Sequence, residues 1–162
     1  SPAPFPASCR RTPEMHPRVC LHQVAFAAEG TPAFIGFCRE ARIPWMTLAT
    51  PHLLDPGGLD EALTALTLGG PRVMTLNHPF ALFPDIEHDT GEAAARLNRA
   101  IDAATALSAS QIYILTGGRG TLDWEQAAAR LTDLLAPCRP RADQAGVRLL
   151  IENANHPVFE GD

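Results

Sequence analysis

Residues 111–151 read QIYILTGGRGTLDWEQAAARLTDLLAPCRPRADQAGVRLLI, and this stretch predicts one complete strand–helix–strand unit. The apolar runs 111–115 and 147–151 have the length and composition of buried strands. A helix is expected between them, beginning near Thr121 or Asp123 and disturbed by the prolines that follow it. Its inner stripe is expected at helical spacing: Trp124, Ala128, Leu131 and Leu135.

The rest of the chain repeats this alternation. Further strands are predicted at 19–26, 45–49 and 72–76, and strand starts are separated by roughly 26 to 39 residues, the size of a βαβ repeat. Thr31 is expected to cap the first helix, with Pro32 at its start. The inner stripes of the first three helices are Phe34, Ile35 and Cys38; Leu59, Leu63 and Leu66; and Leu97, Ile101, Ala104 and Leu107. The fold class is therefore α/β, with about five parallel strands and four helices, in either an open doubly wound sheet or part of a barrel.

Composition restricts the function. A chain of 162 residues with 46% hydrophobic content is the size of a single domain. Its net charge of −5 argues against nucleic acid and anionic membranes as partners, because both favour clustered positive charge. All thirteen Lys or Arg positions are Arg, which excludes a Schiff-base lysine, a P-loop lysine and a Ser-Lys pair.

The remaining compositional features indicate a cytoplasmic protein. The four cysteines are widely spaced and contain no C-x-x-C motif, so a reduced compartment is expected. No apolar run approaches the roughly 20 residues of a membrane-spanning helix, and no secretory signal is visible. Residues 1–17 are rich in proline and are expected to form a flexible leader, which leaves 18–162 as the folded part.

Polar residues follow the predicted strands at the ends where parallel α/β folds bind ligands. Glu152 directly follows the run Leu149-Leu150-Ile151, which would place its carboxylate at the mouth of a barrel. Such a carboxylate suits Mg²⁺ or Mn²⁺, and a metal there would polarise a sugar carbonyl and stabilise an enediolate. Pairing with an arginine or capping of a following helix explains Glu152 equally well from spacing alone.

Histidines are the other candidates for a ligand pocket. His78 and His156 each precede a proline just after a predicted strand, where the imidazole can face a substrate or simply bond to a loop carbonyl. His22 lies within a strand pattern, and either a lumen-facing or a core position fits it. The turn 117–120 offers glycines and Arg119 to an anion, although a tight βα turn explains these glycines more simply.

The succession of short motifs along consecutive strands resembles the xylose-isomerase-like sugar phosphate isomerase/epimerase family. The motifs are Arg18-Val19-Cys20-Leu21-His22-Gln23, Ile101-Asp102-Ala103-Ala104, Thr116-Gly117-Gly118, and Leu149-Leu150-Ile151-Glu152 followed by His156-Pro157. The resemblance implies the first five strands of a (β/α)8 TIM barrel. It further implies a metal-dependent sugar isomerase or epimerase that moves a proton through an enediolate.

The resemblance also implies roles for individual residues. Glu152 stands at the position of a family glutamate that binds the catalytic divalent metal. We expect this metal to be Mn²⁺ or Mg²⁺, with Zn²⁺ and Co²⁺ as the alternatives. His22, His78, Asn153 and His156 would then contact a small carbohydrate substrate. The remaining family ligands, an aspartate, a histidine and a second glutamate, come from later strands that are absent from this sequence. This departure has three possible explanations. The chain is a fragment, a second polypeptide completes the barrel, or two copies of the chain associate.

Two alternatives remain open. Leu76-Asn77-His78-Pro79 and Ile151-Glu152-Asn153 also resemble segments of endonuclease-IV-like DNA repair enzymes. Those enzymes place a metal-binding histidine after strand four, where this chain has Thr116-Gly117-Gly118, and an acidic chain without lysine suits a phosphate backbone poorly. The second alternative is a half-barrel with a structural role and no turnover of its own.

Overall fold

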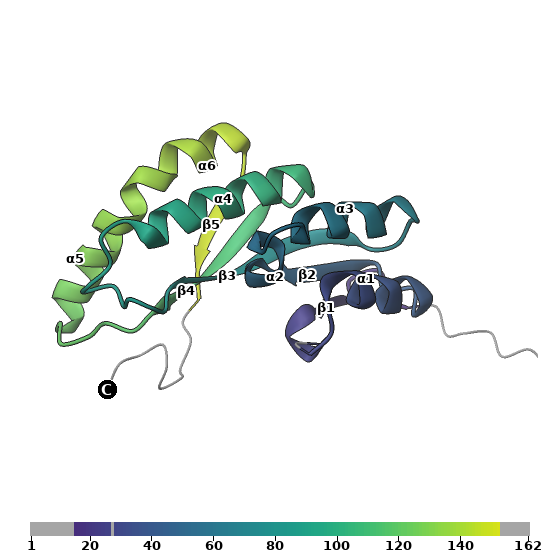
Figure 1. Ribbon diagram of the computed structural model, residues 1–162, viewed down its shortest axis with the longest axis horizontal. Coiled ribbons are helices and arrows are strands. Elements are labelled where there is room, and N and C mark those ends of the chain that lie inside the picture. The colour runs from purple at the N-terminus through teal and green to yellow at the C-terminus, as the bar shows by residue number, and fades with distance from the viewer. Residues whose placement is uncertain (1–14, 27, 153–162) are drawn as a thin grey trace, which may run out of the picture.

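The computed structural model describes residues 15–26 and 28–152 and shows one parallel sheet (Figure 1). Its five strands are hydrogen-bonded in chain order, and each pair of neighbours is parallel. The strands are β1 Cys20–His22, β2 Trp45–Ala49, β3 Arg72–Ala81, β4 Gln111–Gly117 and β5 Arg148–Ile151. A doubly wound sheet reverses its strand order at a switch point, whereas this order is that of a barrel.

Four helical segments connect the strands, as the sequence predicts. The helices are α1 Thr31–Glu40, α2 Thr50–Leu54, α3 Gly58–Thr67, α4 Glu92–Ala106, α5 Trp124–Leu135 and α6 Arg139–Ala145, with 3₁₀ turns at Gln23–Phe26 and Ala136–Cys138. Figure 1 shows α3, α4 and α6 along the same side of the sheet. The sheet side chains that face these helices are fully buried: Met46, Leu48, Leu76, Ile112 and Ile114. Within the described residues no helix layer covers the opposite sheet face, and we call it the lumen face because in a closed barrel it lines the interior.

The start of α5 agrees with the sequence, and its predicted inner stripe agrees in part, because Leu131 and Leu135 pack against the core whereas Trp124 and Ala128 do not. Asp123 accepts a hydrogen bond from the main-chain N of Gln126 (2.8 Å), and Gln126 Oε1 accepts one from the main-chain N of Asp123 (3.0 Å), which forms a capping box. Trp124, predicted to point inward, is 68% exposed, because it is the first residue of the helix and its ring lies against Arg119. Ala128 is also exposed, and Ala127 and Leu134 are the buried residues of this helix.

The first strand is shorter than predicted because Gln23 leaves the strand and becomes buried. Its Oε1 accepts a hydrogen bond from the main-chain N of Ala49 (2.9 Å), and its Nε2 donates to the Thr31 hydroxyl (3.0 Å). The predicted cap at Thr31 is therefore wrong. Gly30 occupies the N-cap position, and the Thr31 side chain binds Gln23 instead of the helix backbone.

The third strand is longer than predicted and continues to Ala81. Asn77 pairs in register with Tyr113, and His78 pairs with Ile114. Because successive strand residues point to opposite faces, Asn77 and Tyr113 share the lumen face, whereas His78 shares the helix face with Ile114. Because β3 continues past residue 76, Asn77 and His78 point to opposite faces of the sheet.

Strands β1 and β5 form the two edges of the sheet within the described residues. On β5, Leu150 is 41% exposed and Ile151 is 53% exposed. An apolar edge of this kind is a surface on which another strand can pair. In the part of the chain that the structure describes, no helix has the length and apolar character needed to cross a membrane.

Candidate functional site

A hydrogen-bonded group of polar side chains lies on the lumen face of β1, β3 and β4. The phenol of Tyr113 is hydrogen-bonded to Nε2 of His22 and to the side chain of Asn77. The other ring nitrogen of His22, Nδ1, accepts a hydrogen bond from the main-chain N of Val24 (2.8 Å). Since Nδ1 accepts, the proton of the neutral ring resides on Nε2, and His22 donates to the Tyr113 oxygen.

The surroundings keep both members of this pair uncharged at neutral pH. Burial lowers the pKa of His22, and the nearby Glu152 carboxylate opposes this effect only in part. Burial, followed by the charge of Glu152, raises the pKa of Tyr113 to about 12, although the hydrogen bond from Asn77 acts in the opposite direction. The phenol therefore keeps its proton and can donate it to an oxygen of a ligand.

Glu152 lies immediately after β5, as the sequence predicts. Its main-chain N donates to the carbonyl of Ile114 (2.9 Å), which extends the β4–β5 pairing by one step. Its side chain is exposed, and within residues 15–26 and 28–152 its carboxylate has no hydrogen bond or ion pair. The arginine-pairing and helix-capping explanations therefore find no partner in that part of the chain. A free hard oxygen donor in this position fits a divalent cation, for which it supplies one ligand.

The other predicted site residues lie elsewhere. His78 is 1% exposed on the helix face, and its Nδ1 is 2.7 Å from the hydroxyl oxygen of Thr50. Burial, together with the positive charge of Arg96, lowers the pKa of His78 to about 4. A contact between His78 and a substrate stays a prediction, and on this face it would occur behind the sheet. Asn153 and His156 lie outside the described residues.

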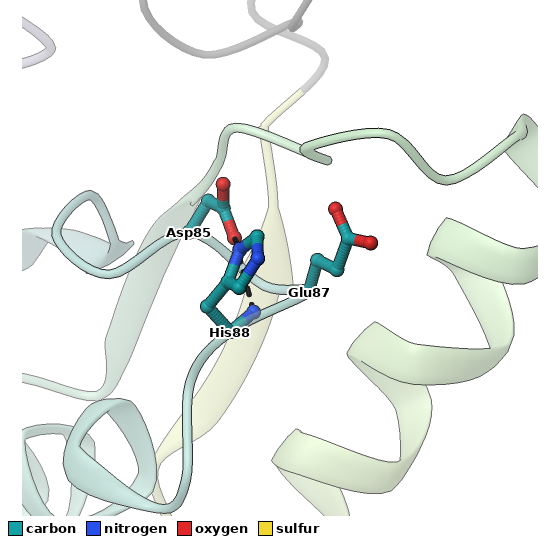
Figure 2. A group of neighbouring side chains, drawn as sticks. All are labelled: Asp85, Glu87 and His88. Atoms are coloured by element: carbon teal, nitrogen blue, oxygen red, sulfur yellow. Dashed lines mark hydrogen bonds and ion pairs between the residues drawn. The ribbon is translucent and has the colours of Figure 1, made fainter.

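A second group of potential metal ligands lies in the loop between β3 and α4 (Figure 2). Asp85, Glu87 and His88 each offer a ligand atom, and these atoms lie within 4.8 Å of one another. Asp85 Oδ1 is 2.7 Å from His88 Nδ1, whereas the Glu87 carboxylate accepts from the main-chain N of Thr121 at 2.6 Å and from its hydroxyl at 2.7 Å. These three residues are not among the candidates predicted from the sequence. Their spacing, D-x-E-H, was the available signal.

Hydrogen bonds within the protein account for much of this second group. Bonds from Thr121 lower the pKa of Glu87, and the bond to Asp85 raises the pKa of His88. Burial acts to raise the pKa of Asp85, but the hydrogen bonds from His88 outweigh it and hold that pKa below its usual value. The group joins the β3–α4 loop to the β4–α5 loop through Thr121, which is a structural use of its carboxylates.

The glycine turn after β4 serves packing and loop structure. A Cβ at Gly117 would lie 1.9 Å from the carbonyl oxygen of Ala81, so only glycine permits this approach between β3 and β4. Arg119 donates to the carbonyl of Leu122, and its guanidinium lies 5.9 Å from the centre of the Trp124 ring. These contacts support the tight-turn interpretation of residues 117–120.

Comparison with known proteins finds similarity in the fold and not in the sequence families. No protein-family model and no curated protein matches the sequence. Solved structures do match. A protein from Sinorhizobium meliloti 1021 has a TM-score of 0.72 at 24% identity, covering 89% of this chain and 53% of its own. The IOLI protein, crystallised with a zinc atom, has a TM-score of 0.69 at 15% identity, covering 86% of this chain and 52% of its own.

A third match is D-psicose 3-epimerase, whose structure was determined in the presence of D-fructose. Its TM-score is 0.65 at 14% identity, and the match covers 85% of this chain and 52% of that protein. The chain thus spans about half the length of the structures it matches. These matches and the strand order confirm the fold expected from the sequence, which is an incomplete (β/α)8 TIM barrel with five parallel strands.

Proposed function

We propose that this chain is the five-strand portion of a metal-dependent isomerase or epimerase that acts on a small sugar, sugar phosphate or keto-sugar. The observation that carries the proposal is the Glu152 carboxylate, free of partners in the described residues and close enough to influence both His22 and Tyr113. A zinc atom in one structural neighbour and the epimerase name of another support this general kind of activity.

The proposed roles follow from the chemistry of each side chain. Glu152 contributes one ligand to a divalent cation, Mn²⁺ or Mg²⁺ in preference to Zn²⁺ or Co²⁺, and the cation supplies polarisation of the substrate carbonyl. His22 orients the Tyr113 hydroxyl, which then donates to a substrate oxygen. Asn153 and His156 remain proposed substrate contacts. A second carboxylate is needed to move the proton between carbon atoms, and we expect it on a strand beyond β5.

The proposal requires an assembly larger than these strands. One carboxylate does not complete the coordination of Mg²⁺ or Mn²⁺, so other ligands must come from further strands. These strands follow Glu152 in the same polypeptide, belong to a second polypeptide, or belong to a second copy. The apolar β5 edge, with exposed Leu150 and Ile151, supports pairing with an additional strand at that position.

The cellular location is part of the proposal. Cys20, Cys38 and Cys138 are free thiols, although Cys38 and Cys138 are buried and Cys20 is exposed. Free thiols are usual in a reduced compartment, which supports the cytoplasmic location expected from the sequence.

Proton exchange at the carbon next to the substrate carbonyl tests the proposed reaction directly. The complete assembly is incubated with ketohexoses and Mn²⁺ in D₂O, and loss of the carbon-bound proton is followed by ¹H NMR. Exchange is expected only with metal, and Glu152→Gln is expected to abolish it, because the amide is a weaker ligand and carries no charge. Glu125→Gln on the exposed side of α5 is the matched control and should retain exchange. Full exchange by Glu152→Gln would contradict the proposal.

A further inference from the structure

A cavity of about 340 Å³ lies behind the sheet, on the helix face and therefore on the opposite side from Glu152. It is open to solvent on one side and is lined by α2, the end of β3, the following loop and α4. The residues that shape its chemistry are Thr50, Leu54, Asp55, His78, Arg96 and Arg99. Neither the lumen-face group nor the proposed metal uses this space.

The cavity wall contains a buried ring nitrogen without a partner. His78 is 1% exposed, its Nδ1 is satisfied by the Thr50 hydroxyl at 2.7 Å, and its Nε2 has no hydrogen bond in the structure. A buried polar atom that lacks a partner costs on the order of 1–3 kcal/mol relative to a satisfied one. A polar group bound in the cavity would supply the missing partner.

Two arginines from α4 approach the same cavity. Arg96 donates from Nη2 to the carbonyl of Phe80 (3.0 Å), whereas its Nε is buried and has no partner. Arg99 donates from Nη2 to the carbonyl of Leu54 (2.5 Å) and is otherwise exposed. Within the described residues neither guanidinium is within ion-pair distance of a carboxylate. The acidic groups nearby are Glu92, which interacts with Arg96 at longer range, and Asp55 in the cavity wall.

We propose that this cavity binds a small oxyanion, either a phosphate or a carboxylate group. In this proposal the Thr50 hydroxyl donates a hydrogen bond to Nδ1 of His78, so the neutral ring carries its proton on Nε2. The Nε2–H of His78 and the Nε–H of Arg96 then bind the anion at the base, and Arg99 supplies charge at the exposed side. Arginine is well suited to both anions because its planar donors match their oxygen geometry.

The charged groups around His78 link anion binding to its protonation. Arg96 from α4 disfavours the imidazolium, and Asp55, which directly follows α2, is the acidic residue in the cavity wall. With the cavity free of anion, burial and Arg96 lower the pKa of His78 to about 4. A bound anion opposes the Arg96 charge and stabilises the imidazolium, so the pKa of His78 is expected to rise when the anion binds.

NMR titration of the His78 ring in the full chain tests the proposal. Sodium phosphate and sodium acetate are added in separate series, with sodium chloride at equal ionic strength as the reference. Saturable shifts of the His78 signals and a raised pKa are expected with at least one oxyanion. Tighter binding of phosphate identifies a phosphorylated ligand, and tighter binding of acetate identifies a carboxylate ligand.

Arg99→Gln is the diagnostic variant because its side chain is exposed and its loss leaves the core intact. It is expected to weaken binding about tenfold or more, since it removes a charged donor. Arg139→Gln on α6 is the control and should bind as the parent does. Shifts that chloride reproduces, or equal binding by Arg99→Gln, would overturn the proposal and leave a buried water as the partner of His78.

Discussion

Tyr113 offers a direct measurement of the geometry around Glu152, because it is the single tyrosine of the sequence. Ionisation of a free tyrosine has a pKa near 10. In the structure, burial and the Glu152 charge raise the pKa of Tyr113 to about 12. Replacing Glu152 with Gln removes the charge but leaves the burial. The titration midpoint of this variant is therefore expected to lie below that of the parent chain and still above 10.

The assay is the rise of tyrosinate absorbance during alkaline titration, with circular dichroism at each pH to confirm that the chain stays folded. Glu125→Gln serves as the control, because this carboxylate is exposed on α5 and does not influence Tyr113. Its midpoint should equal that of the parent. A parent midpoint near 10, or the same midpoint with and without the Glu152 carboxylate, would refute the placement of Glu152 beside the lumen-face group.

Two further predictions concern the loop that precedes α4. Asp89 is fully buried, and its carboxylate accepts hydrogen bonds from the main-chain N of Gly91 and of Ala93, both at 2.9 Å. The variant Asp89→Ala is therefore expected to lower the free energy of unfolding by about 3 kcal/mol, as measured by urea denaturation. The variant Asp89→Asn keeps one acceptor oxygen and should lose less of this free energy. Equal stability of the parent, Asp89→Ala and Asp89→Asn would contradict the prediction. Asp85→Asn is expected to lower the pKa of His88, as measured by NMR, because Asp85 raises it. Folding raises the pKa of His88. The stability that the Asp85–His88 bond contributes is therefore fully present below the pKa of His88 in the unfolded chain, and it is lost as the pH rises through the pKa in the folded chain. An unchanged His88 titration would show that the bond is absent in solution.

The order of strands and helices could be predicted because the apolar residues of each element recur along the sequence at the spacing of a strand or of a helix. The run 111–115 alternates between buried Ile112 and Ile114 and partly exposed neighbours, and the structure places it in β4 as expected. Helix ends with specific capping chemistry, such as Asp123, were also predictable. The end of the first strand was not, because Gln23 is buried through bonds to residues distant in sequence.

Residues of the candidate site that directly follow a strand could be predicted from the sequence. Those that lie within a strand were harder to predict. Glu152 was found because an apolar run ends immediately before it. The sequence does not identify Tyr113 and Asn77 as members of the site, because Tyr113 lies in an apolar run and Asn77 lies just beyond the predicted end of the strand at residue 76. His78 also lies beyond that predicted end. Once β3 is known to continue to Ala81, alternation alone separates Asn77 from His78.

The proposed metal position is tested most directly by anomalous X-ray diffraction at the manganese edge, from crystals of the complete assembly grown with Mn²⁺. The expected result is an anomalous peak about 2 Å from a carboxylate oxygen of Glu152 on the lumen face, as ligand distances for small divalent cations require. The peak should be absent from crystals of the Glu152→Gln variant. A manganese peak at Asp85, Glu87 and His88 with none at Glu152 would contradict the account.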